Sequence, residues 1–133
     1  MAVEWRENLA IGVKEIDDQH KELFKIVNDL FEACNKAKGK EEVGKVIDFL
    51  GDYVVKHFNN EEKLQQKHNY PDYASHKQKH ELFIQEFIEL KNQFEKEGPS
   101  GLFVIKVNKK VIDWLVQHIG KVDKALGLYL KNK

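Results

Sequence analysis

The sequence predicts an all-α fold, an up-down-up-down four-helix bundle with an N-terminal arm and a short C-terminal helix. Apolar residues recur every three or four positions over four long stretches, which is the period of an amphipathic helix. A short turn that contains glycine or proline separates each stretch from the next. Short turns between long amphipathic helices place neighbouring helices antiparallel, which gives the bundle.

The elements follow from local signals along the chain. A single domain over residues 1–133 is expected at this length. Residues 1–16 are expected to form an extended arm that Trp5 anchors on the bundle. Asp17 and Asp18 are suited to cap the first helix, and Gly39 is suited to end it. The expected helices span residues 18–37, 41–67, 72–96 and 102–119, and a tail helix spans residues 122–131.

Polar side chains interrupt the apolar stripe of every helix. Residues four apart share a helix face, so His57 with Glu61 and His76 with His80 each present two donors together. Burial without a partner would cost roughly 2–7 kcal/mol for each group, so these groups need a common partner. Imidazole and carboxylate are donors for first-row transition metals. The sequence therefore predicts a shared metal centre formed by His20, His57, Glu61, His76, His80, His118 and Asp123.

The spacing of the last two candidate ligands does not fit a regular α-helix. His118 and Asp123 are five residues apart, which places them on different faces of an α-helix. Gly120 lies between them and permits a local distortion. We therefore expect the helix to loosen near Gly120, so that the Asp123 carboxylate turns back toward the other ligands.

Composition limits the classes of partner. Lys plus Arg and Asp plus Glu number 22 each, so no net field favours nucleic acid or an anionic membrane. The N-terminal residues lack the basic and apolar segments of a signal peptide, and no apolar run is long enough to span a bilayer. We expect a soluble, cytoplasmic protein without membrane insertion. The balanced surface charge permits a monomer.

Five motifs resemble those of one known family over essentially the whole chain. They are DDQHK at 17–21, HFNNEE at 57–62, YP at 70–71, HKQKH at 76–80, and WLVQHI at 114–119 followed by Asp123. The combination is similar to the hemerythrins, and Trp5 and the chain length resemble their single-domain bacterial members. The resemblance implies a non-haem di-iron centre, Fe2+/Fe3+, with an oxo or hydroxo bridge and dioxygen as its ligand.

The resemblance also implies how the ligands divide between the two irons. His76, His80 and His118 would hold one iron, His20 and His57 would hold the other, and Glu61 and Asp123 would bridge them. One coordination position would then stay open, on the two-histidine iron. Candidates for the apolar wall of an oxygen pocket are Phe58, Trp114, Leu115 and Ile119. Gln65 stands where relatives often carry methionine, and Gly120 lies near the last ligand pair; both bear on the pocket.

The implied function is reversible dioxygen binding in oxygen carriage, storage or delivery, with an oxygen-consuming enzyme as a conceivable partner. An oxygen or redox sensor that acts through a partner is one alternative. A di-iron oxidase or peroxidase is another, although such sites are rich in carboxylates and marked by Glu-x-x-His repeats, which this sequence lacks. We therefore expect a binding protein and not an enzyme. Structural zinc fits poorly, because it prefers four closed ligands.

Overall fold

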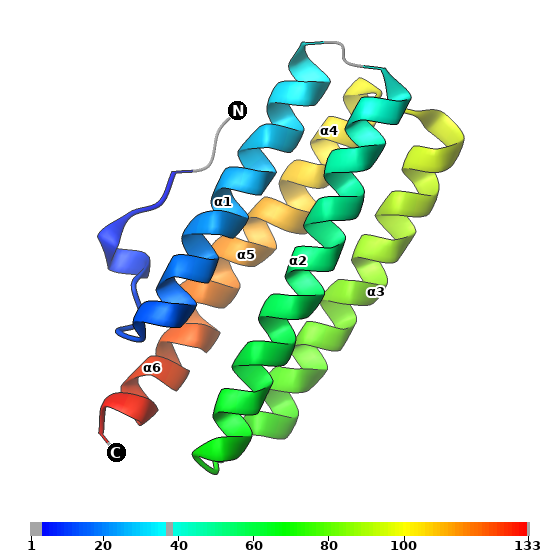
Figure 1. The fold of residues 1–133 in the computed structure, drawn as a ribbon. Coiled ribbons are helices and arrows are strands. Elements are labelled where there is room, and N and C mark those ends of the chain that lie inside the picture. The colour runs from blue at the N-terminus through cyan, green and yellow to red at the C-terminus, as the bar shows by residue number, and fades with distance from the viewer. Residues whose placement is uncertain (1–3, 37–38, 133) are drawn as a thin grey trace.

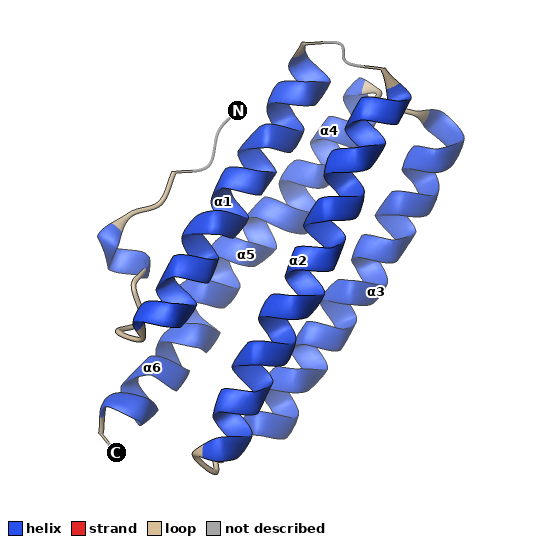
Figure 2. Cartoon of the chain, viewed as in Figure 1, coloured by secondary structure: helices blue, strands red, loops and turns tan. Residues whose placement is uncertain are grey.

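The computed structural model describes residues 4–36 and 39–132, and all regular structure within them is helical (Figure 2). Four long helical rods form the predicted up-down-up-down bundle (Figure 1). The first three rods are single α-helices, and the fourth joins α- and π-helical segments. In chain order the elements are the 3-10 turn η1 (Glu7–Leu9), α1 (Lys14–Asn35), α2 (Lys40–Lys67), α3 (Tyr73–Glu97), α4 (Gly101–Val107), η2 (Asn108–Asp113), α5 (Trp114–Gln117), η3 (His118–Asp123) and α6 (Lys124–Lys131).

The first helix begins four residues earlier than predicted, so residues 14–16 are not part of an extended arm. α1 begins at Lys14, and no side chain caps it. Asp17 instead accepts hydrogen bonds from the backbone N–H groups of Ile11 at 2.8 Å and Gly12 at 3.3 Å. The carboxylate therefore ties the arm to the first turn of α1, where its charge also favours the helix dipole. The predicted end of this helix at residue 37 lies outside the described residues.

The turns on either side of α3 agree with the prediction to within one residue. Asn69 has a positive φ of 54° at the end of α2, a conformation that asparagine tolerates. The following residue, Tyr70, donates its N–H to the carbonyl of Gln65 at 2.9 Å. At the start of α4 the Ser100 hydroxyl accepts the Phe103 N–H at 3.1 Å. This N-cap satisfies a donor that the helix itself leaves unpaired.

The predicted gap before a separate tail helix is wrong. The chain stays helical from Gly101 to Lys131, with π-helical segments η2 and η3 inside the rod. In η3 the Lys124 N–H donates to the Ile119 carbonyl, five residues earlier. This hydrogen-bond pattern widens the turn without breaking the helix. The wider turn accommodates the five-residue spacing of His118 and Asp123. The predicted departure from α-helical geometry near Gly120 is therefore confirmed, although the helix continues through it.

The topology brings the polar stripe residues to one end of the bundle. The start of α1, the end of α2, the start of α3 and the end of the fourth rod lie at the same end (Figure 1). Apolar side chains from all four rods fill the remaining core. The buried core therefore has a polar layer at the end where these four segments meet.

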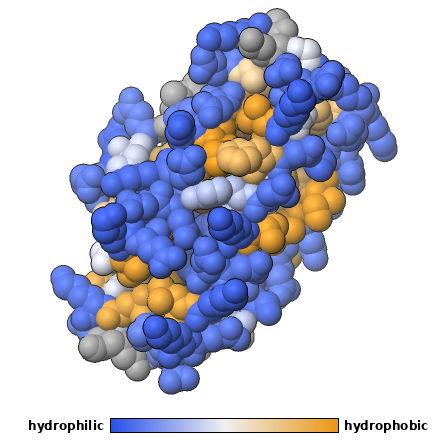
Figure 3. All heavy atoms as spheres, in the orientation of Figure 1, coloured by the Kyte–Doolittle hydropathy of each residue, from blue (hydrophilic) through white to orange (hydrophobic). Residues whose placement is uncertain are grey.

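Hydrophilic side chains cover most of the face shown in Figure 3, with smaller hydrophobic patches between them. Large apolar residues that stay at least half exposed include Phe49, Leu82, Ile88, Ile105 and Leu128. Within residues 4–36 and 39–132, the helices lack the length and apolar character that crossing a membrane requires.

Candidate metal centre

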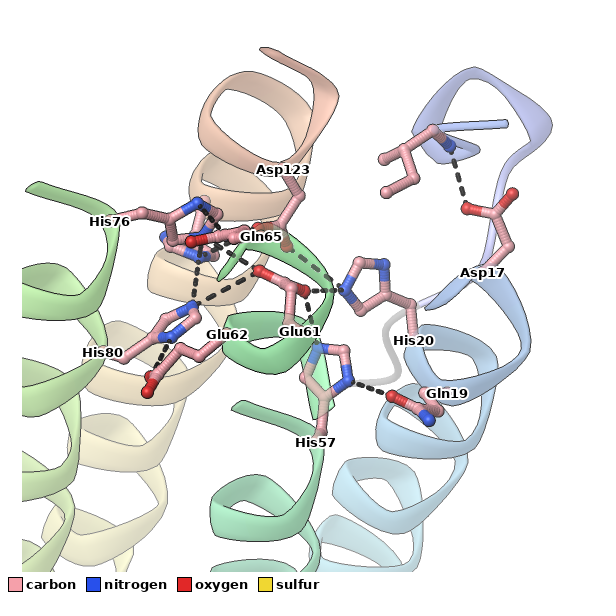
Figure 4. A network of polar contacts seen from close by, with 12 residues as sticks. Asp17, Gln19, His20, His57, Glu61, Glu62, Gln65, His76, His80 and Asp123 are labelled. Carbon is pink, nitrogen blue, oxygen red and sulfur yellow. Dashed lines mark hydrogen bonds and ion pairs between the residues drawn. The ribbon is translucent and has the colours of Figure 1, made fainter. Parts of the chain in front are cut away.

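All seven residues predicted as metal ligands meet in the polar layer. Each is at most 5% exposed. Figure 4 shows Glu61 between one group of histidines on the side of α3 and another on the side of α1. One turn of α2 supplies two of the seven, one turn of α3 supplies two, and η3 supplies two more. The helical spacing of the seven candidate ligands in the sequence therefore brings their side chains together in the fold.

The Glu61 carboxylate faces both histidine groups, with a different oxygen toward each. Its Oε1 lies 2.9 Å from Nε2 of His76 and 3.4 Å from Nε2 of His80. Its Oε2 lies 3.2 Å from Nε2 of His57 and 3.8 Å from Nε2 of His20. A carboxylate in this orientation is suited to bridge two cations.

The Asp123 carboxylate has the same arrangement. Its Oδ1 lies 2.9 Å from Nε2 of His76 and 3.1 Å from Nε2 of His118. Its Oδ2 lies 3.1 Å from Nε2 of His20. Two overlapping groups result, and they share both carboxylates: Glu61, His76, His80, His118 and Asp123 form one, and His20, His57, Glu61 and Asp123 form the other.

The donor atoms are spaced as ligands of a common cation. The Nε2 atom of His118 lies 3.1 Å from that of His76 and 3.2 Å from that of His80. Donors bound at right angles to one metal at about 2.1 Å lie about 3.0 Å apart. Both oxygens of Glu61 and of Asp123 are buried, and ring nitrogens of the histidines are the polar atoms that face them. Because buried anionic oxygens need compensation, the residues present fit a pair of bound metal ions.

Three of the histidines have a polar partner on the outer side of the ring. Such partners fix the tautomer and turn the other ring nitrogen toward a metal. The sequence alone does not indicate this role for Gln19 or Glu62, and it marks Gln65 only as a polar residue where relatives often carry methionine. The Nδ1 contacts are His57 to Gln19 Oε1 at 2.6 Å, His80 to Glu62 Oε2 at 2.9 Å and His76 to Gln65 Nε2 at 2.8 Å.

Without a bound metal, protons on the histidines would compensate the buried carboxylates. Burial opposes the charged form of His20, but hydrogen bonds and charges from Asp123 and Glu61 outweigh burial and raise its pKa to about 9. The same balance raises the pKa of His76 to about 9. Burial would raise the pKa of Glu61, but hydrogen bonds from surrounding histidines hold it well below its usual range. Bound metal would replace these protons, so metal binding is coupled to proton release.

The metal-free protein should therefore lose stability as the pH rises from about 6.5 to about 9. His20 and His76 have folded pKa values of about 9 against an ordinary value of 6.5. Their stabilising contribution is complete below the unfolded pKa and disappears as the pH passes the folded pKa. Burial lowers the pKa of His118, so the titration of His118 affects stability below this pH window. Urea midpoints of metal-free and zinc-loaded protein across the window test this: only the metal-free midpoint should fall, and a constant midpoint would contradict the prediction.

The π-helical turn η3 brings the last ligand pair together without relying on glycine. The i→i+5 pattern returns His118 and Asp123 toward one face, and their Nε2 and Oδ1 atoms lie 3.1 Å apart. Gly120 has no positive φ. A Cβ at Gly120 would meet only Leu9 Cδ2, at 3.9 Å. The expected conformational role of Gly120 is therefore wrong, because its backbone is accessible to any residue.

The four candidates for an apolar oxygen wall lie beside the polar layer or in the adjoining core. The Phe58 ring stacks on His80 with centroids 3.8 Å apart, and it also lies 5.9 Å from the His57 ring. Trp114 stacks on His118 at 4.2 Å and is only partly buried. Leu115 and Ile119 are 2% and 1% exposed in the hydrophobic core cluster. Both stacked aromatic rings therefore cover the three-histidine group.

Comparisons with known proteins agree with the geometry. Residues 11–129 match the family model described as Hemerythrin HHE cation binding domain. A bacteriohemerythrin of Methylococcus capsulatus is 40% identical over 84% of this chain and 82% of its own length. A hemerythrin-like protein of Naegleria gruberi is 35% identical over 90% of this chain and 86% of its own. A crystal structure of wild-type hemerythrin matches with a TM-score of 0.85 and 36% identity, covering 96% of each chain.

Proposed function

Because the chain belongs to the hemerythrin family, we propose that it binds dioxygen reversibly at two iron ions held by the seven residues of the polar layer. The observation that carries the proposal is the unequal division of donors. Three histidines lie on one side of the bridging carboxylates and two on the other. The two metal positions therefore have different capacities for a further ligand.

The division leaves one position open. Counting one oxygen from each carboxylate, the group with His76, His80 and His118 offers five donors, and the group with His20 and His57 offers four. A bridging oxide or hydroxide, as the family resemblance implies, would add one donor to each side. Octahedral coordination takes six donors, so the three-histidine side is complete and the two-histidine side lacks one. A small exogenous ligand would bind there.

The chain's own residues give the site little negative charge and an apolar core side. Five imidazoles and two carboxylates carry two negative charges between them, fewer than a carboxylate-rich site. Iron bound there supplies reversible electron transfer to dioxygen. The buried Leu115 and Ile119 side chains would limit the entry of water and protons from the core side. This balance favours release of dioxygen over its consumption, so we expect binding without turnover.

Oxygen uptake by the reduced, iron-loaded protein tests the proposal. With one open position for each pair of metals, anaerobically reduced protein should take up one dioxygen for every two irons and return it under inert gas. Continuous oxygen consumption with accumulating product would instead indicate an oxidase or peroxidase.

Leu115→Ser should accelerate autoxidation of the oxygenated protein by roughly tenfold, on the scale at which residues around a metal site alter its activity. Leu115 is 2% exposed, and a hydroxyl there would admit water to the apolar side of the site. The adjacent Val116 is 38% exposed, so Val116→Ser makes a similar chemical change outside the core and serves as the control. The rate at which the oxygenated spectrum decays in air is the measurement. Equal decay in both variants would rule out a protective role for Leu115.

A further inference from the structure

Gln65 is a fully buried polar residue whose amide touches a candidate ligand. Its side chain is 0% exposed, and its Nε2 atom lies 2.8 Å from Nδ1 of His76. Its Oε1 atom is buried without a hydrogen-bond partner. Gln65 is not a member of either metal-binding group. Desolvating an amide is unfavourable, so a buried amide in direct contact with a ligand ring is expected to form a hydrogen bond that compensates this cost.

The role of Nε2 in the His76 ring determines whether Nδ1 carries a proton. Its Nε2 atom lies 2.9 Å from both Glu61 Oε1 and Asp123 Oδ1, in the position of a metal donor. An imidazole that binds metal through Nε2 keeps its proton on Nδ1. That Nδ1–H needs an acceptor, and an amide N–H cannot accept it. The two ends of an amide have nearly the same shape, so a half-turn places Oε1 against Nδ1 at the same distance.

We infer that Gln65 is a positioning residue: its amide oxygen accepts the Nδ1–H of His76 and so directs the Nε2 lone pair of that ring into the metal centre. The half-turn pairs Oε1 with the ring N–H and moves the NH2 group to the position that Oε1 occupied. This inference rests on the metal centre of the proposed function, but it does not depend on dioxygen binding.

The backbone around Gln65 holds its side chain in place. Its carbonyl accepts the Tyr70 N–H at 2.9 Å, which fixes the last turns of α2 against the following loop. The Tyr70 ring is 8% exposed and lies edge-on to the His76 ring, with centroids 6.5 Å apart. Tyr70 therefore contacts both the Gln65 backbone and the His76 ring, next to the contact between the amide and the imidazole.

The neutral charge of Gln65 distinguishes it from the partner of the neighbouring ring. His80 faces the Glu62 carboxylate, whose side chain is 13% exposed, whereas His76 faces a fully buried amide. A carboxylate makes the bound imidazole a stronger donor, and an amide orients the ring with less effect on its basicity. Gln65 therefore fixes the orientation of His76 without adding a third buried negative charge to the site.

Zinc binding and imidazole NMR test the inference without iron or oxygen. Zn2+ is diamagnetic and accepts imidazole donors. In the zinc-loaded wild type we expect a slowly exchanging Nδ1–H proton on His76. Gln65→Met removes the acceptor at similar volume, and should weaken zinc binding by about 10- to 100-fold with loss of that proton signal. Gln66→Met, the same change at the exposed neighbouring position, should leave both unchanged.

Gln65→Glu separates the hydrogen bond from side-chain packing. It keeps an acceptor of the same length, so the Nδ1–H signal should persist and move downfield, even if Gln65→Met folds poorly. Full zinc affinity in folded Gln65→Met, or a proton on Nε2 in the wild type, would overturn the inference. Failure of the wild type to bind zinc would overturn the metal centre itself, whereas failure of iron-loaded protein to bind dioxygen would leave the Gln65 result intact.

Discussion

Glu61→Gln should reduce the metal content of the protein from two ions per chain to one or none. The Glu61 carboxylate turns one oxygen toward each histidine group, so in the proposed centre it would supply one donor to each metal. The amide oxygen can replace one of the two oxygens, but the NH2 group cannot bind a cation. The loss of affinity should exceed the roughly 10- to 100-fold expected when an outer partner is removed.

Metal analysis of the purified variant after loading with iron or zinc measures this effect. Glu81→Gln makes the same chemical change at an exposed position of α3 and should retain two ions per chain. Circular dichroism of both variants establishes that the comparison is between folded proteins. Two tightly bound ions in Glu61→Gln would show that this residue does not bridge the metals.

Gly127→Ala should destabilise the fold by about 1–3 kcal/mol, the usual cost of forcing atoms into a filled space. A Cβ at Gly127 would overlap the carbonyl oxygen of Ile11 and lie 2.8 Å from the Ile11 Cβ. The N-terminal arm and α6 approach each other so closely here that one of them must move. The free energy of unfolding in urea measures the effect.

Gly120→Ala provides the matched control for Gly127→Ala. A Cβ at Gly120 would make only an ordinary contact with Leu9, at 3.9 Å. Alanine is favoured over glycine in helices by up to about 1 kcal/mol, so this variant should be as stable as the wild type or more stable. Both variants should still bind two metal ions for each folded chain. Equal stability of Gly127→Ala and the wild type would mean that the arm does not pack as described.

Periodicity within each helix is sufficient to predict how the polar side chains converge. His57 and Glu61, like His76 and His80, are four residues apart, so any helix places each pair on one face. The five-residue spacing of His118 and Asp123 is incompatible with an α-helix, and this conflict predicts the unusual turn η3. The other π-helical segment, η2, contains no such pair, so nothing in its sequence distinguishes it from an α-helix.

Contacts between different helices could not be predicted in the same way. Gln19 lies 38 residues from its partner His57, and Glu62 lies 18 residues from its partner His80. Spacing within one helix carries no information about such pairs, which depend on the rotation of packed helices. The first residue of α1 could not be predicted from the local sequence either. Aspartate is favourable both at an N-cap and in the first turn of a helix. Only the position of the arm makes Asp17 an acceptor for its backbone.

The most direct test of the account is the visible spectrum of iron-loaded, anaerobically reduced protein, cycled between dioxygen and inert gas with the iron counted for each chain. A site with one open position and a dry, imidazole-rich environment should give a coloured species that appears with dioxygen and vanishes on purging, at two irons per chain. Irreversible conversion to the diferric form in the first cycle, or an iron count other than two, would contradict a reversible oxygen-binding centre.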